Sequence, residues 1–125
     1  MGRTDRRTLG RRAEEYAFRH LIRHGLTPVT RNFRTRLGEI DLVMLDGDCL
    51  AFVEVRYRSA RAFVDASLTV DARKQRKLGA AAELFLARNA VFRHHPCRFD
   101  VVGVDRGDDG GVSLDWVRDA FRPGD

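Results

Sequence analysis

Two apolar-rich segments, residues 38–45 and 49–57, constrain the fold of this chain more than any other feature. Both are rich in Val, Leu and Phe or Ile, and both have the length of a β-strand. Between them lie Asp46, Gly47 and Asp48, which are residues typical of a tight turn. The two segments are therefore predicted to form an antiparallel β-hairpin.

The segments around the hairpin complete an alternation of helices and strands. Gly25 follows the first helical pattern in a C-terminal cap position. Pro28 places the strand that comes next at an edge of the sheet, or makes its start irregular. Besides the hairpin, the predicted elements are a helix over residues 9–24, a strand over 26–34, a helix that begins after Thr69 or Asp71 and runs to about 89, strands over 98–105 and 112–116, and a turn of helix or coil over 117–121.

The order of these elements, α-β-β-β-α-β(-β), predicts an α/β fold with a central mixed sheet flanked by helices. A chain of 125 residues is long enough for one ordinary domain and too short for two. We therefore expect a single domain over residues 1–125, with a basic flexible arm at 1–8 and a tail at 123–125.

Charge is distributed unevenly along the chain. Residues 1–36 carry ten arginines against three acidic residues, whereas residues 99–125 carry three arginines against seven aspartates. The basic N-terminal part suits a polyanionic partner such as nucleic acid, because phosphate contacts supply most of the non-specific affinity in such complexes. A solvated basic face in an arginine-rich protein is the alternative explanation.

Composition also limits the protein's location and its metal chemistry. No run approaches the ~18 apolar residues of a membrane-spanning helix, so a cytoplasmic protein without a membrane partner is expected. Cys49 and Cys97 are isolated, and we interpret both as reduced packing residues. His94, His95 and Cys97 do not favour a zinc site, because adjacent histidines point to different sides and no second ligand pair follows.

Two acidic residues in the hairpin form the strongest candidate site. Asp41 and Glu54 point to the same face of the sheet in either plausible register: directly opposite if residues 47–48 form the turn, and diagonal if 46–47 do. Two carboxylates this close raise the pKa of at least one of them unless a cation lies between them. Mg²⁺ or Mn²⁺ would relieve that repulsion and would serve phosphodiester hydrolysis. Glu14, within the apolar stripe of the first helix, could supply a third oxygen ligand.

An ordinary surface network is the competing interpretation of these acids. An aspartate followed thirteen residues later by Glu-x-Arg is a common coincidence. Glu14 also has a second explanation, because a glutamate near the start of a helix interacts well with the helix dipole. The arginines available to pair with the two hairpin acids are Arg34, Arg36, Arg56 and Arg58.

Several blocks of the chain resemble a known family. In order, they are Gly10-Arg-Arg-Ala-Glu14, Arg31-Asn-Phe-Arg34, Gly38-Glu-Ile-Asp-Leu-Val43, Phe52-Val-Glu-Val-Arg56 with Arg58, Lys74, and Arg98-Phe-Asp-Val-Val102. Over about residues 9–105 the chain resembles the YraN-like uncharacterised bacterial family, which is similar to archaeal Holliday junction resolvases. The resemblance implies a restriction-endonuclease-like three-layer fold and a metal-dependent nuclease ancestry, with Glu14, Asp41 and Glu54 at the acidic positions.

The chain departs from that family at one position of the expected site. The family usually has Glu-Val-Lys where this chain has Glu54-Val55-Arg56, and the lysine of such nucleases is thought to position the attacking water and to stabilise charge. An arginine is practically never deprotonated, so Arg56 is expected to stabilise charge only. The chain's only lysines, Lys74 and Lys77, lie on adjoining turns of the second helix, where they either contact phosphate or are simply solvated.

The leading hypothesis from sequence is a nuclease dependent on Mg²⁺ or Mn²⁺ that acts on branched or single-stranded DNA. Asp41 and Glu54 would hold the metal, Glu14 would assist, and Arg56 would stabilise charge. The rivals are a nucleic-acid-binding module that has lost catalysis and an assembly scaffold for a protein partner. Because similar small nucleases are often dimers, a homodimer is expected. The residues expected to contact nucleic acid are Arg11, Arg12, Arg34, Arg36, Arg58, Lys74 and Lys77.

Overall fold

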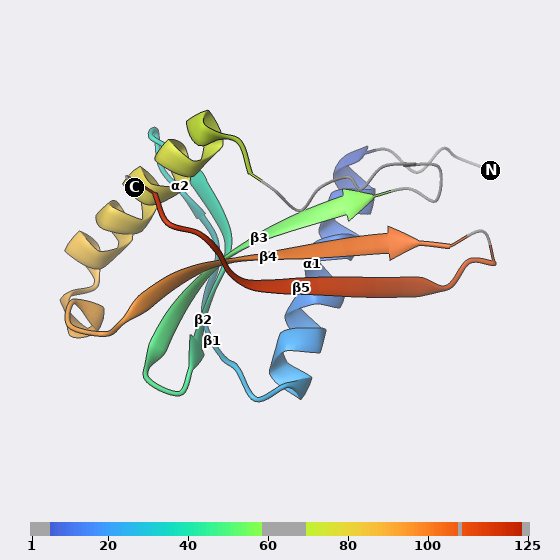
Figure 1. Cartoon of the computed structure of the whole chain (residues 1–125), viewed down its shortest axis with the longest axis horizontal. Helices are drawn as coiled ribbons and strands as arrows, with labels where there is room; N and C mark the ends of the chain where they lie inside the picture. The colour runs from blue at the N-terminus through green and yellow to red at the C-terminus, as the bar shows by residue number, and fades with distance from the viewer. Residues whose placement is uncertain (1–5, 59–69, 108, 124–125) are drawn as a thin grey trace.

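The computed structural model describes residues 6–58, 70–107 and 109–123, and it shows a three-layer α/β fold (Figure 1). The elements follow the predicted order. They are α1 (Arg6–Arg23), β1 (Thr27–Arg34), β2 (Glu39–Asp46), β3 (Cys49–Arg58), α2 (Ala72–Arg88), the short 3-10 helix η1 (Ala90–Phe92), β4 (Cys97–Arg106) and β5 (Val112–Phe121). Neither of the two described α-helices is long and apolar enough to cross a membrane.

The five strands form one mixed sheet in the order β1-β2-β3-β4-β5. Neighbouring strands are antiparallel except β3 and β4, which run parallel. A parallel step needs a long crossover connection, and the segment between these two strands contains α2. The sheet is therefore a three-stranded meander joined through one helical crossover to a final antiparallel pair.

The register of the central hairpin settles the alternative that the sequence left open. Asp46 pairs with Cys49 and Leu42 pairs with Val53, so residues 47–48 form the turn. Gly47 has a φ of 62°, a left-handed conformation that glycine adopts without strain. The paired register ends at Leu42–Val53, and beyond it the Asp41 side chain accepts a hydrogen bond from the backbone N–H of Val55, the residue after Glu54 on β3.

The sheet is covered on both faces, and each helix builds its own part of the core (Figure 1). On one face α1 buries Ala13, Ala17 and Leu21 against alternate residues of β2, β3 and β4. On the other face α2 buries its apolar side, including Phe85, against the residues in between. Full burial of one large apolar side chain contributes roughly 1.5–3 kcal/mol, so these two layers fix how both helices sit on the sheet.

The two ends of the chain differ from the prediction. The first helix begins at Arg6, so residues 6–8 are helical and do not belong to a flexible arm. The rest of the predicted arm, residues 1–5, lies outside the described residues. At the other end Pro123 lies against α2, where a Cβ added to Gly79 would come within 2.8 Å of the proline Cβ.

The last strand is twice as long as predicted, and the expectation of helix or coil over 117–121 is wrong. β5 continues to Phe121, with a bulge at which Asp119 adopts a φ of 52°. The fully buried Asp100 of β4 holds this half of β5, because it accepts hydrogen bonds from Trp116 Nε1 at 3.1 Å and from the Asp119 backbone N–H at 3.0 Å. The sequence did not reveal that a buried carboxylate on the neighbouring strand serves these donors.

Candidate active site

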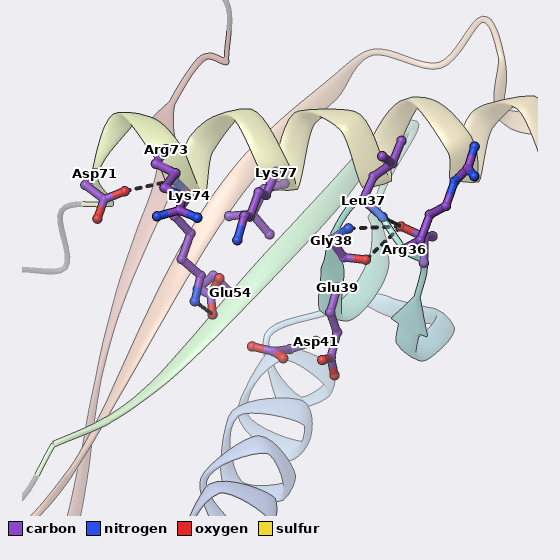
Figure 2. A pocket seen from close by; sticks show the side chains of 12 residues that line it. Arg36, Leu37, Gly38, Glu39, Asp41, Glu54, Asp71, Arg73, Lys74 and Lys77 are labelled. Atoms are coloured by element: carbon purple, nitrogen blue, oxygen red, sulfur yellow. Dashed lines mark hydrogen bonds and ion pairs between the residues drawn. The ribbon is translucent and has the colours of Figure 1, made fainter.

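An open cleft of about 650 Å³ lies where the start of α2 passes over the hairpin and the β1–β2 loop (Figure 2). Its wall combines four basic and four acidic side chains with a few apolar ones. The lining residues are Thr35, Arg36, Leu37, Gly38, Glu39, Asp41, Glu54, Asp71, Arg73, Lys74, Lys77 and Leu78. The structure therefore brings the two predicted hairpin acids and both predicted lysines into one cavity.

Asp41 and Glu54 lie on the strand side of this cleft (Figure 2). The Asp41 carboxylate accepts a hydrogen bond of 2.8 Å from the backbone N–H of Val55, which ties it to β3 beside Glu54. Glu54 is only 8% exposed. Burying a glutamate costs free energy unless a charged partner compensates. A glutamate at this buried position therefore serves either a function or a structural contact.

In β2 the alternation of side chains between the two faces of the sheet is interrupted at Asp41. Ile40 belongs to the apolar cluster on the α2 face, whereas Leu42, two residues on, belongs to the cluster on the α1 face. In a regular strand these two residues would share a face. Opposite the break on β1 is Asn32, a non-glycine residue with a φ of 53°. This local twist places Asp41 within electrostatic reach of Glu54 and also of Glu14 on α1.

The pKa of Asp41 is raised to about 8 from an ordinary value of 3.8. Burial is the largest cause, the negative charge of Glu54 is the next, and Glu14 and Glu39 add to it, while the Val55 N–H opposes it. A carboxylate buried beside another carboxylate resists ionisation in this way. Asp41 thus carries the electrostatic strain predicted from the hairpin spacing.

The pKa of Glu14 is also raised, chiefly by burial and then by the charge of Glu39. Arg31 and a hydrogen bond with Asn32 act in the opposite direction. Its neighbour Glu15 lies on the polar side, as predicted, and pairs with Arg19 and Arg31 at 3.1 and 2.9 Å. The charge of Glu14 therefore acts on Asp41, although Glu14 does not line the cleft.

Lys74 brings an ammonium group from α2 to the acid pair. Its Nζ lies 3.2 Å from Glu54 Oε1 and reaches down from the helix (Figure 2). The helix starts directly before it, because Asp71 caps α2 by accepting a 2.8 Å hydrogen bond from the Lys74 backbone N–H. Lys77 lines the same cleft one turn further along. Lys74 thus has a carboxylate partner, which neither interpretation of the lysines included.

The loop after β1 holds the other side of the cleft against α2. The Thr35 hydroxyl donates a hydrogen bond of 2.8 Å to the Gly38 carbonyl oxygen and accepts one of 3.0 Å from the Gly38 backbone N–H. These two bonds close a tight turn. Only glycine fits at position 38 without a shift of the backbone, because a Cβ there would lie 2.5 Å from the Lys77 carbonyl oxygen. The glycine of the Gly-Glu-Ile-Asp block thus allows the helix to approach the loop.

Most of the arginines expected to contact nucleic acid lie elsewhere. Arg34 does not line the cleft, although it pairs at 3.3 Å with Glu39, which does. The Arg58 side chain, 13% exposed, pairs with Asp105 and Asp115 at 2.6 and 2.8 Å, so it links β3 with β4 and β5.

Three further arginines have different surroundings. Arg11 and Arg12 are exposed on α1, and Arg12 borders a separate small hollow beside Tyr16. Arg56 is half-buried on β3 and is not one of the residues that line the cleft.

Sequence reasoning missed three of the charged residues that line the cleft, one of which, Asp71, it recognised only as a helix cap. Arg73 stands in the first turn of α2, and its spacing of four residues from Lys77 was a signal that the two share a helix face. Glu39 was visible in the sequence on the same face as Asp41, but only the fold shows that it borders the cavity. Arg36, which was among the predicted residues, lines the cleft as well.

The donor chemistry of the site fits a hard divalent cation. Asp41 and Glu54 offer carboxylate oxygens, and Mg²⁺ typically binds through one or two carboxylates and completes its coordination with water and substrate phosphate. Within the described parts of the chain, no group of three or more His, Cys, Asp or Glu side chains is arranged to hold a metal ion. A metal here would therefore rest on the acid pair, with Glu14 contributing charge.

Comparison with known sequences identifies the family. The model of the uncharacterised protein family UPF0102 matches residues 13–104. The chain belongs to this family. It is 50% identical over 120 residues to a UPF0102 protein of Pseudomonas paraeruginosa, with 95% of this chain and 96% of the relative covered.

Two further relatives have a similar extent. A UPF0102 protein of Ectopseudomonas mendocina is 51% identical over 113 residues, covering 90% of this chain and 93% of the relative. Another, from Pseudomonas syringae, is 45% identical over 121 residues, covering 97% and 98%. The resemblance drawn from the sequence blocks is thereby confirmed, and the description of the family as uncharacterised leaves the function to be argued from the site.

Proposed function

We propose that this protein is a metal-dependent nuclease that hydrolyses phosphodiester bonds of DNA at the cleft. The observation that carries the proposal is the half-buried Asp41, tied to β3 by the Val55 N–H and raised to a pKa of about 8, next to the buried Glu54 in one cleft. Strongly perturbed acids in a cleft are characteristic of functional sites. Mg²⁺ or Mn²⁺ is the cofactor that this pair of carboxylates suits.

Asp41 and Glu54 would hold the ion at the strand side of the cleft. A divalent ion there supplies the charge that lowers the pKa of a water molecule and draws negative charge off the phosphate. In the reaction, the water oxygen bonds to phosphorus, the P–O ester bond breaks, and the departing alcohol oxygen receives a proton. The fixed carboxylates orient the site, so little reorganisation is needed during the reaction.

The basic residues of the cleft would bind the DNA backbone. Arg73, Lys74 and Lys77 project from the first turns of α2, and Arg36 lines the cleft from the β1–β2 loop on its other side. Lysine binds phosphate as a flexible point charge, whereas arginine offers a planar fork. The cleft is open, which allows a nucleic-acid strand to pass along it, and branched or single-stranded DNA would expose its backbone most easily.

A cleavage assay tests the proposal. Wild type, Asp41→Asn and Glu54→Gln are incubated with labelled duplex, single-stranded and four-way-junction DNA in Mg²⁺, in Mn²⁺ and in EDTA. We expect metal-dependent cleavage by wild type and a loss of more than about 100-fold in both variants, because each loses a ligand charge. Glu15→Gln is the matched control, since Glu15 pairs with Arg19 and Arg31 and does not line the cleft. Cleavage that survives in Asp41→Asn would rule out the assigned site.

DNA binding without catalysis is the second candidate, and one observation favours it. Arg56 stands where a nuclease lysine was expected, and it does not line the cleft. A binding module would retain DNA in EDTA with an affinity that falls steeply with salt. Salt-sensitive binding by wild type, without cleavage under any metal condition, would favour this candidate over the nuclease.

A further inference from the structure

Lys74 and Glu54 form an ion pair between a half-exposed side chain and a buried one. The Lys74 side chain is 47% exposed, whereas the Glu54 side chain is 9% exposed, and their atoms are 3.2 Å apart. The α2 backbone is fixed at this point by the Asp71 cap and by its close approach to Gly38. Only the four-carbon lysine stem can move easily, and it can swing outward into the open cleft.

We propose that Lys74 is a resident counter-ion of the acid pair and that DNA phosphate draws it away, which makes metal and DNA bind cooperatively. The inference rests on the proposed function, because it assigns a regulation to the same metal site. In the free protein the ammonium occupies part of the space beside Glu54 where a divalent ion would bind. With DNA in the cleft, the ammonium contacts phosphate and Glu54 becomes available.

Electrostatics requires a competition of this kind. An ammonium group and a divalent cation on the same carboxylate repel each other, so either one lowers the affinity for the other. A DNA phosphate is negatively charged, as the Glu54 carboxylate is, so it offers the Lys74 ammonium an alternative partner within the same cavity. Reciprocity then follows: if DNA raises the affinity for metal, metal raises the affinity for DNA by the same factor.

Lys77 provides a matched comparison within the same cleft. It is the chain's other lysine and lies one helical turn beyond Lys74. In the part of the chain that the structure describes, no ion pair joins it to Glu54 or Asp41. Loss of Lys77 should therefore weaken phosphate binding without relieving any competition for the metal.

The experiment measures Mn²⁺ binding by electron paramagnetic resonance, which detects the free ion. Wild type, Lys74→Gln and Lys77→Gln are titrated with Mn²⁺, alone and with a short phosphorothioate DNA that resists hydrolysis, and the Mn²⁺ bound by the DNA itself is subtracted. For wild type we expect DNA to raise the Mn²⁺ affinity about five- to ten-fold, at the lower end of usual coupling strengths.

The variants separate the inference from the proposed function. In Lys74→Gln the Mn²⁺ affinity should already be high without DNA and should change less than about two-fold when DNA is added, whereas Lys77→Gln should keep the wild-type coupling. If Lys74→Gln keeps both the weak affinity and the coupling, the counter-ion role is overturned while metal binding stands. If no variant binds Mn²⁺ with or without DNA, the proposed function and this inference both fail.

Discussion

Replacing Asp41 by Asn should stabilise the metal-free protein. An acid whose pKa is about 8 in the folded state and 3.8 when unfolded gives up about 4 kcal/mol of folding free energy at pH 7, at about 1.36 kcal/mol per pKa unit. Partial solvent access of the carboxyl group and local relaxation reduce this, so we expect a gain of about 2 kcal/mol. Asparagine keeps an oxygen that can accept the Val55 N–H, so the backbone contact survives.

The gain depends on pH in a defined direction. Between pH 3.8 and about 8 the folded protein binds more protons at Asp41 than the unfolded chain does, so wild-type stability falls as pH rises through this window. The advantage of Asp41→Asn should therefore be largest at pH 7 to 8 and should shrink toward pH 5. Urea denaturation in EDTA at several pH values measures this difference in the free energy of unfolding. In a thermal melt at pH 7, the Tm of the variant should be higher than that of wild type by about 8 °C.

Glu15→Gln is the control for a general effect of removing an acid. The Glu15 side chain is 42% exposed, pairs with Arg19 and Arg31, and is not among the charges that raise the pKa of Asp41, so its loss should change stability by less than about 1 kcal/mol. Equal or lower stability of Asp41→Asn at pH 7 would refute the reasoning, because the carboxyl group would then not be strained by burial and by Glu54.

Two further predictions concern the scaffold of the site. Gly38→Ala should destabilise the protein by about 1–3 kcal/mol, since its Cβ would press on the Lys77 carbonyl, whereas Gly10→Ala, with open space around its Cβ inside α1, should stabilise it by about 0.5–1 kcal/mol in thermal denaturation. Asp100→Ala should cost about 3–5 kcal/mol in urea denaturation, because it removes one of the two carboxylates that pair with the mostly buried Arg98 and takes the acceptor from Trp116 Nε1 and the Asp119 N–H. A loss below about 1 kcal/mol would contradict that role for Asp100.

The main layers of the fold were predictable because they follow local patterns. Apolar spacing identified both helices, and the turn residues around Gly47 identified the hairpin. The second half of β5 was missed, because its strand conformation depends on Asp100, a buried acceptor about nineteen residues away in the chain. Contacts at that separation leave no periodic signal in the strand's own sequence.

The approach of Asp41 to Glu54 was expected from strand alternation, but β2 breaks its alternation at Asp41, and that local twist could not be read from the sequence. Lys74 was recognised as a residue of interest, but its contact with Glu54 depends on how α2 packs across the sheet. The role expected of Arg56 rested on its place in the Glu-Val-Arg block. Only the three-dimensional arrangement shows that the lysine near the acids comes from the helix.

Anomalous diffraction from crystals soaked in Mn²⁺ tests the central claim most directly, because it locates the ion without reference to activity. We predict one strong peak in the cleft, with Asp41 and Glu54 oxygens about 2.1 Å from it, and no peak in crystals of Asp41→Asn. Millimolar Mn²⁺ should suffice to compete with Lys74 in the absence of DNA. No peak at this position, or an unchanged peak in the variant, would contradict the assignment of these two carboxylates as a metal site.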